Sequence, residues 1–223
     1  MKKQIVIILA AVICGSALST QHVGEIHERG VTLLDLPHDP ALFREDVRPH
    51  VERIIAAHGE EEWQTVVLTS EFHTHLGIYS IVGAKMGLRA RDYFDAGIDE
   101  MLVTSFAGLK PPVSCLNDGL QVSTGATLGH GTISVADGSP TLPKAVFTHD
   151  DKSISLQLKD RYWKTVRTDI KNILKDHGLD DPQYWQLVRK LGIQYWLQWS
   201  RNDIFDITIV DTPQSHASQT TAH

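Results

Sequence analysis

The stretch PPVSCLNDGLQ, residues 111–121, is the segment from which the fold and the site of this chain are best inferred. Ser114 is a residue type that often caps helices, so a short helix is expected to begin there and to end by Gly125. Cys115 would then lie in the first helical turn, where free backbone N–H groups and the helix dipole favour a thiolate over a thiol. The thiolate is the form that binds metal ions and the form that acts as a nucleophile.

Strands and helices are expected on both sides of this segment, without strict alternation. β-Rich apolar runs and turn residues predict strands at 63–69, 100–106, 132–136, 144–148, 153–158 and, as an edge strand, 205–210. Apolar spacing and end signals predict helices at 40–58, 76–90, 114–125, 160–177 and 181–199. This order predicts an α+β fold, with a mixed or antiparallel sheet packed with helices and a C-terminal helical pair.

Residues 1–19 are expected to be a signal peptide. Two lysines precede an apolar run at 5–14, and small residues at 17 and 19 have the spacing of a cleavage site. Cleavage would make the protein periplasmic or secreted, and a lipoprotein acylated at Cys14 is the minor alternative. No later apolar run approaches the ~20 residues of a membrane span.

Beyond the signal peptide, we expect an extended segment at 20–39, a core at 40–160, a C-terminal helical extension at 161–211 and a disordered tail at 212–223. The 223 residues carry a net charge of −6, which becomes −8 when the two lysines of the signal peptide are removed. Negative charge of this size argues against nucleic acid and anionic membranes as partners.

Two histidines, His73 and His75, directly follow the strand expected at 63–69. At a strand-to-helix bend two imidazoles can converge on one ion, and neutral imidazole is a common ligand of zinc. Two ordinary histidines at a helix start are the alternative interpretation. The helix that follows contains glycines at 77, 83 and 87, which is tolerable where another backbone packs closely.

Cys115 would be the only cysteine after signal cleavage, so it can form no disulfide within the mature chain. It is then buried and inert, paired between chains, a nucleophile or a metal ligand. Asp118 shares its helix face and is a candidate fourth ligand, histidine-orienting group or general base. Gln121 is a candidate hydrogen-bonding partner of a bound group, and His130, in a glycine-rich turn, is a candidate outer ligand. Taken singly, Asp118 and Gln121 are equally explained by helix stabilisation and plain polar exposure.

Aromatic residues concentrate in the last two expected helices. Their near-helical spacing favours a packing layer, in the core or at an oligomer interface, over an aromatic ligand cage. The residues concerned are Trp163, Trp185, Trp196 and Trp199, with Tyr162, Tyr184 and Tyr195.

Two linked motifs resemble those of a known family. The segments EFHTHLG at 71–77 and GAKMG at 83–87 resemble the pattern FHGHLGP…LGxRMG. The longer segment PPVSCLNDGLQVSTGATLG at 111–129 is similar to the pattern PPxSCxxDGxQxxTGxTxGxG. In this order the two motifs resemble the FmdE-like family, which takes its name from formylmethanofuran dehydrogenase, and the resemblance covers roughly residues 40–160.

The resemblance implies an α+β core, often a homodimer, with a cleft where histidine and cysteine side chains meet a metal, usually zinc. By position it points to His75 and Cys115 first and to His73 next, while Asp118 and Gln121 match the Asp and Gln of the pattern. Three departures are visible: residue 74 is Thr rather than Gly, residue 78 is Ile rather than Pro, and the cysteine-rich zinc ribbon of some members is absent.

Three functions stay open from the sequence. The first is an exported protein with a mononuclear His73/His75/Cys115 site, most simply for zinc, and a hydrolytic or lyase-like reaction on an unknown small molecule with Asp118 as base. The second is a non-catalytic carrier of a metal or metallocofactor. The third is a metal-free thiol enzyme with Cys115 as nucleophile. The chain is not the catalytic component of the dehydrogenase, because the iron–sulfur clusters of that chemistry need several cysteines.

Overall fold

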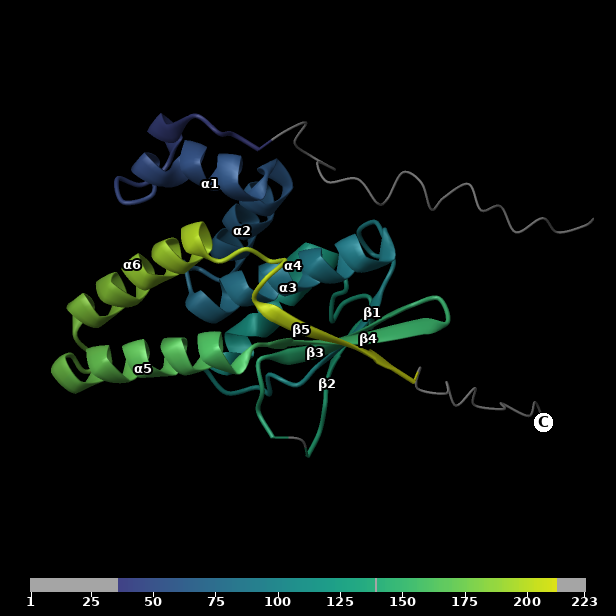
Figure 1. Ribbon diagram of the computed structural model, residues 1–223. Helices are drawn as coiled ribbons and strands as arrows, with labels where there is room; N and C mark the ends of the chain where they lie inside the picture. Colours follow the sequence, from purple (N-terminus) through teal and green to yellow (C-terminus); the bar gives the residue numbers. More distant parts are fainter. Residues whose placement is uncertain (1–35, 139, 212–223) are drawn as a thin grey trace, which may run out of the picture.

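The computed structural model describes residues 36–138 and 140–211, which form a five-stranded mixed sheet with helices packed on it (Figure 1). The strand order is β2-β1-β3-β4-β5; β1 and β2 are parallel, and the other neighbours are antiparallel. The strands are β1 Leu102–Ser105, β2 Ile133–Val135, β3 Lys144–His149, β4 Lys152–Leu158 and β5 Phe205–Val210. The predicted α+β class is confirmed.

Six α-helices and three short 3₁₀ turns within these residues complete the order of elements. The α-helices are α1 Val51–His58, α2 Glu60–Phe72, α3 Ile78–Phe94, α4 Leu116–Thr124, α5 Asp160–Asp176 and α6 Pro182–Gln198. The 3₁₀ turns are η2 Pro40–Leu42, η3 Arg48–His50 and η4 Val113–Cys115. The expected C-terminal helical pair is confirmed as the antiparallel α5 and α6, and β5 is the expected edge strand (Figure 1).

The strand expected at 63–69 is wrong, because these residues belong to helix α2. The β-branched residues of this run favour a strand, but three glutamates in the first turn suit the positive end of a helix dipole. Trp63, Val66 and Thr69 are buried at a spacing of three, which matches a helix face. The two histidines therefore follow a helix rather than a strand.

The single helix expected at 40–58 is also wrong. Asp39 does cap, since its Oδ1 accepts the Ala41 N–H at 2.9 Å, but the element it begins is only the 3₁₀ turn η2. A second turn, η3, contains Pro49, whose ring and missing N–H oppose a continuous helix, so that α1 begins only at Val51.

Helices α3 and α4 are in backbone contact through glycines. A methyl group at Gly83 would lie 2.1 Å from the Leu116 carbonyl oxygen, and one at Gly119 would lie 2.0 Å from the Ser80 carbonyl oxygen. Gly87 is equally close to Ser123 Oγ, at 1.9 Å. The expectation that a second backbone packs against this glycine-bearing helix is confirmed.

Two hydrophobic clusters lie on opposite sides of α3. One joins α3 and α4 to the sheet through residues such as Met86, Leu120, Phe147 and Leu156, and the other joins α1, α2 and α6 around Trp63 and Trp196, whose rings stack at 5.1 Å. Trp199 belongs to the first cluster, where it stacks on Tyr195 at 4.1 Å, so the aromatic residues of α6 serve the core as expected.

A buried charged cluster ties the end of α6 to α2 and α3. Lys85, which is 1 % exposed, donates from Nζ to Glu62 Oε1 and, at 2.7 Å, to the Trp199 carbonyl oxygen. Arg201 Nη1 donates to Glu62 Oε2 at 3.1 Å and to the His58 carbonyl oxygen at 3.0 Å. Because each buried charge has a partner, removing one of them would leave an uncompensated charge in the core.

The expected signal peptide, most of the segment at 20–39 and the tail at 212–223 lie outside the described residues. Among the helices of the part that is described, none combines the length and apolar character needed to cross a bilayer.

Gly119→Ala should destabilise the protein by about 3 kcal/mol or more, because its methyl group would meet the backbone of α3, which cannot move aside as a side chain can. Chemical denaturation followed by circular dichroism measures the effect. Gly178→Ala is the control, since a methyl group there has nothing within 4 Å and should change stability little. Equal stability of the two variants would contradict the close helix contact.

Candidate functional site

A cleft of about 320 Å³ opens beside the N-terminal half of α4. Its walls come from α4, the loop before it, the turn after it, strand β2 and the residue that ends α2. The residues that line it are His73, Leu109, Pro111, Ser114, Cys115, Asn117, Asp118, Gln121, Leu128, Ile133 and Val135. Four of the six candidate residues predicted from the sequence thus share one cleft: His73, Cys115, Asp118 and Gln121.

His73 is held in one orientation by Asp118. Its ring Nδ1 lies 2.6 Å from Asp118 Oδ2, so in the neutral ring an Nδ1–H donates to the carboxylate and Nε2 carries the lone pair. The side chain is only 10 % exposed, and Nε2 is buried without a hydrogen-bond partner. A buried imidazole nitrogen with an available lone pair, opposite a carboxylate-bound N–H, is the arrangement that metal-ligating histidines commonly have.

Cys115 lies in the cleft wall with a half-buried side chain, immediately before α4. Ser114 makes no capping hydrogen bond, so the predicted cap is wrong, and α4 begins two residues later, at Leu116. Burial, together with the nearby Asp118 carboxylate, raises the pKa of the Cys115 thiol above its ordinary value. The predicted thiolate is therefore also wrong for the protein on its own, because desolvation outweighs the helix start.

His75 is close to His73 but opens onto a different hollow. The two ring centroids are 4.2 Å apart, and His75 Nδ1 is 3.2 Å from the His73 carbonyl oxygen. The intervening Thr74 has φ +63°, a left-handed turn that directs its two neighbours differently. His75 lines a hollow of about 280 Å³ and meets the edge of Trp185 at 5.7 Å. Burial lowers the pKa of the His75 ring, which favours its neutral form.

Gln121 and Asn117 hold the cleft margins. Gln121 Oε1 accepts the Leu128 N–H at 3.3 Å, and Asn117 Nδ2 donates to the Gly108 carbonyl oxygen at 2.9 Å. Asn117 Oδ1 also accepts from the Ser105 hydroxyl. The polar face of α4 thus fixes the two loops that border the cleft.

His130 does not join the site. It is exposed, it is absent from the cleft lining, and its Nδ1 lies 3.4 Å from Asp99 Oδ1. The glycine-rich turn itself behaves as expected, because Gly125 with φ +75° ends α4 and donates its N–H to the Gln121 carbonyl oxygen at 2.9 Å.

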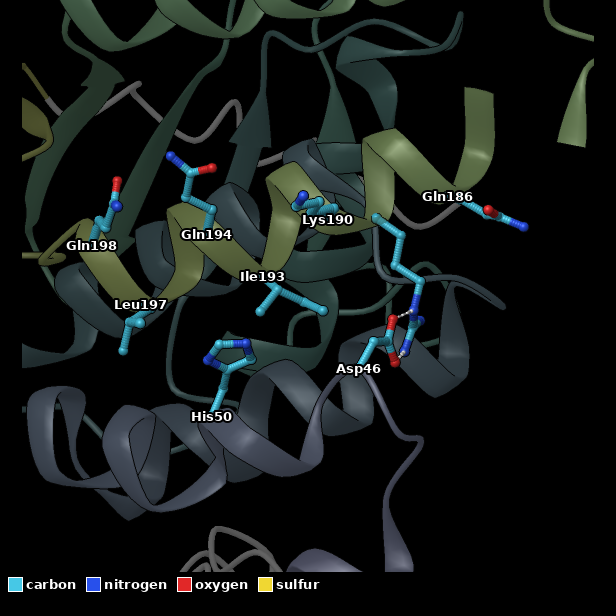
Figure 2. A pocket seen from close by; sticks show the side chains of 9 residues that line it. Asp46, His50, Gln186, Lys190, Ile193, Gln194, Leu197 and Gln198 are labelled. Atoms are coloured by element: carbon cyan, nitrogen blue, oxygen red, sulfur yellow. Dashed lines mark hydrogen bonds and ion pairs between the residues drawn. The ribbon is translucent and has the colours of Figure 1, made fainter. Parts of the chain in front are cut away.

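A larger hollow, of about 640 Å³, lies between α6 and the segment leading into α1 (Figure 2). Figure 2 shows the His50 ring beneath Ile193 and Leu197, with the Asp46–Arg189 ion pair at one end. The neighbouring Arg189 guanidinium lowers the pKa of the Asp46 carboxyl group. None of the residues predicted as ligands lines this hollow, so it is separate from the cleft.

The predicted donor set fits a metal ion in part. His73 offers a buried, unpartnered nitrogen, and Cys115 offers a sulfur in the same cleft. Within residues 36–138 and 140–211, however, no three His, Cys, Asp or Glu side chains are placed together to hold one ion. His75 is the predicted ligand that faces elsewhere.

The chain belongs to the family described as FmdE, Molybdenum formylmethanofuran dehydrogenase operon, whose sequence model matches residues 72–206. The family predicted from the two motifs is therefore confirmed, and the match includes α5 and α6. A solved structure with similarity is that of a tungsten formylmethanofuran dehydrogenase FmdE-like protein from Syntrophus aciditrophicus. It is 19 % identical, with a TM-score of 0.44, over 69 % of this chain and 73 % of that chain. No curated protein matches.

Sequence reasoning missed four residues at or next to the site. Asn117 was passed over although it lies in the motif beside Asp118, and Leu109 and Leu128 are apolar residues in loops expected to be polar. Trp185 was assigned to a packing layer, yet it is 49 % exposed and contacts His75. A large apolar residue flanked by glycine, such as Leu128 before Gly129, was the available signal.

The His73 ring should be found in the Nδ1–H tautomer, because the Asp118 carboxylate accepts that proton. Nitrogen-15 NMR of histidine-labelled protein at mildly alkaline pH reports the tautomer. Asp118→Ala should shift the ring toward the Nε2–H form, whereas Asp99→Ala, which removes the carboxylate beside His130, should leave His73 unchanged. A wild-type His73 with the proton on Nε2 would contradict the site geometry.

Proposed function

We propose that this chain binds one divalent transition metal ion, most simply zinc, in the cleft beside α4. His73 Nε2 and Cys115 Sγ are its first two ligands, a nitrogen and sulfur pair that zinc accepts well. The observation that carries the proposal is the buried, unpartnered Nε2 of His73 behind its Asp118-bound Nδ1. Nothing else in the described contacts uses that nitrogen.

His75 is the proposed third ligand, reached by rotation of an exposed side chain. The two imidazole edges meet at Gly77: a methyl group there would lie 3.1 Å from His75 Nε2 and 3.2 Å from His73 Cδ2. His75 Nδ1 is held only by the His73 carbonyl oxygen at 3.2 Å, so a rotation breaks one hydrogen bond. The lowered pKa of His75 keeps the ring unprotonated, as ligation requires.

The chemistry that this arrangement supports is hydrolytic or lyase-like. A zinc ion with three protein ligands supplies a Lewis acid with one open position. On the protein side, Asp118 fixes the His73 tautomer through Oδ2, and its side chain is 31 % exposed, so the carboxylate can also accept a proton from a bound molecule. The metal-free thiol enzyme is less favoured, because the raised pKa of Cys115 leaves it protonated at neutral pH.

A non-catalytic carrier is the second candidate. It is favoured by one observation, namely that His75 faces a hollow other than the one that holds His73 and Cys115. A site with two ligands in place and a third that swings in would release its ion readily. Dissociation into a chelator measures this: release within seconds favours the carrier, and release over hours favours the enzyme.

Export and self-association complete the proposal. The charge, apolar run and small residues at 1–19 support a cleaved signal peptide and a periplasmic location. A homodimer is proposed from the resemblance of the two motifs alone.

Purified, tag-free protein should bind about one equivalent of zinc, and loss of a ligand should weaken binding more than the roughly 10- to 100-fold typical of a supporting residue. Calorimetry and elemental analysis of wild type, His73→Ala and Cys115→Ser measure this, and Asp118→Ala should fall in the 10- to 100-fold range. His130→Ala is the matched control and should bind as wild type does. A wild-type protein that binds no transition metal would end both the enzyme and the carrier proposals.

Zinc binding should release a proton from Cys115 at neutral pH. Burial raises the pKa of the thiol, so below that pKa the free protein carries the S–H proton and the metal must displace it. Affinity should therefore rise with pH, by up to about tenfold per pH unit, and level off above the thiol pKa. Calorimetry in buffers of different ionisation enthalpy counts the protons. Cys115→Ser should release about one fewer, and equal release by the two proteins would contradict a protonated Cys115 ligand.

A further inference from the structure

Two strongly exposed leucines border the cleft that carries the proposed metal ligands. Leu109 is 79 % exposed and Leu128 is 71 % exposed, and both line the cleft. Pro111, Ile133 and Val135 continue the apolar lining between them. Large apolar side chains gathered at one opening, rather than scattered singly, indicate a surface that contacts another apolar group.

Polar side chains of α4 hold both leucines in place. Asn117 donates to the carbonyl oxygen of Gly108, the residue before Leu109, and Gln121 accepts the backbone N–H of Leu128 itself. Asn117 and Gln121 are four residues apart, so they lie on one face of α4 and brace the two margins from the same side. The exposed leucines are therefore fixed parts of the cleft and not the ends of loose loops.

The polar groups occupy the opposite end of the same space. His73, Cys115 and Asp118 line it, and His73 presents a buried nitrogen with no partner. The cleft volume of about 320 Å³ lies at the lower end of the range for small-molecule sites and is too small for a folded partner to enter. One end thus suits a polar or metal-binding group, and the other suits hydrocarbon.

We propose that the ligand of this cleft is a small amphipathic molecule, with a polar head at His73 and Cys115 and an apolar chain or ring between Leu109 and Leu128. The metal-binding part of the head rests on the proposed function, whereas the apolar part rests only on the leucines and the residues that brace them. Leu109 and Leu128 are then specificity residues that select for the length of the apolar portion.

The dependence of affinity on chain length tests this. n-Alkyl hydroxamates of about two to eight carbons are titrated into zinc-loaded protein, and the matching n-alkyl carboxylates into chelator-treated protein. Each added CH₂ should tighten binding by about two- to fourfold until the cleft is filled. The leucine methyl signals of Leu109 and Leu128 should shift during both titrations in NMR spectra.

The double variant Leu109→Ser/Leu128→Ser should lose the chain-length dependence but keep wild-type affinity for the shortest hydroxamate. Because both leucines are exposed, the variant should fold as wild type does. Ile209→Ser is the matched control: Ile209 is also 79 % exposed, lies on β5 and is not part of the cleft lining. It should keep the full chain-length dependence.

The outcomes separate this inference from the proposed function. No chain-length dependence in either wild-type series, or one that persists in the double variant, overturns the inference while metal binding still stands. Hydroxamates that bind no better to zinc-loaded protein than carboxylates bind to chelator-treated protein, with the chain-length dependence intact, refute the metal and support the inference. A homodimer that dissociates in the double variant would assign the leucines to a second copy of the chain and also overturn the inference.

Discussion

The backbone contact between α3 and α4 is the constraint on which the rest of this structure depends. Gly83 and Gly119 leave no room for even a methyl group where the two helices cross, so their separation and rotation are fixed by main-chain atoms. Side-chain repacking cannot take up an error at such a contact. Since α3 begins just after the His-x-His turn and α4 begins just after Cys115, the same contact sets where the two halves of the site meet.

The polar interactions around the site build on that contact. Asp118, one residue before Gly119, reaches back to His73, and Asn117 and Gln121 on the same helix hold the loops that carry the exposed leucines. On the other side of α3, the buried Lys85 and Glu62 secure α2, whose last residue leads into His73. One short helix thus organises the metal-binding end and the apolar end of the cleft together.

Much of this organisation could be predicted from sequence, and the failures have physical causes. The strands after residue 100 were found because turn residues such as Asp150 bound them clearly, and α5 and α6 because their apolar spacing is regular. Helix α2 was missed because β-branched residues outweighed a buried spacing of three that only tertiary packing makes visible. The state of Cys115 was misjudged because position in a helix is readable from sequence, whereas desolvation of the thiol is not. The opposite openings of His73 and His75 follow from the left-handed Thr74, a conformation that a threonine rarely adopts.

The central claim is that His73 and Cys115 bind the same ion, and X-ray absorption spectroscopy of the zinc-loaded protein tests it most directly. The account predicts one sulfur neighbour at about 2.3 Å together with nitrogen neighbours at about 2.0–2.1 Å. The sulfur signal should vanish in Cys115→Ser, and the nitrogen signal should weaken in His73→Ala. A wild-type spectrum with nitrogen and oxygen neighbours alone, or one that neither substitution changes, would contradict the account.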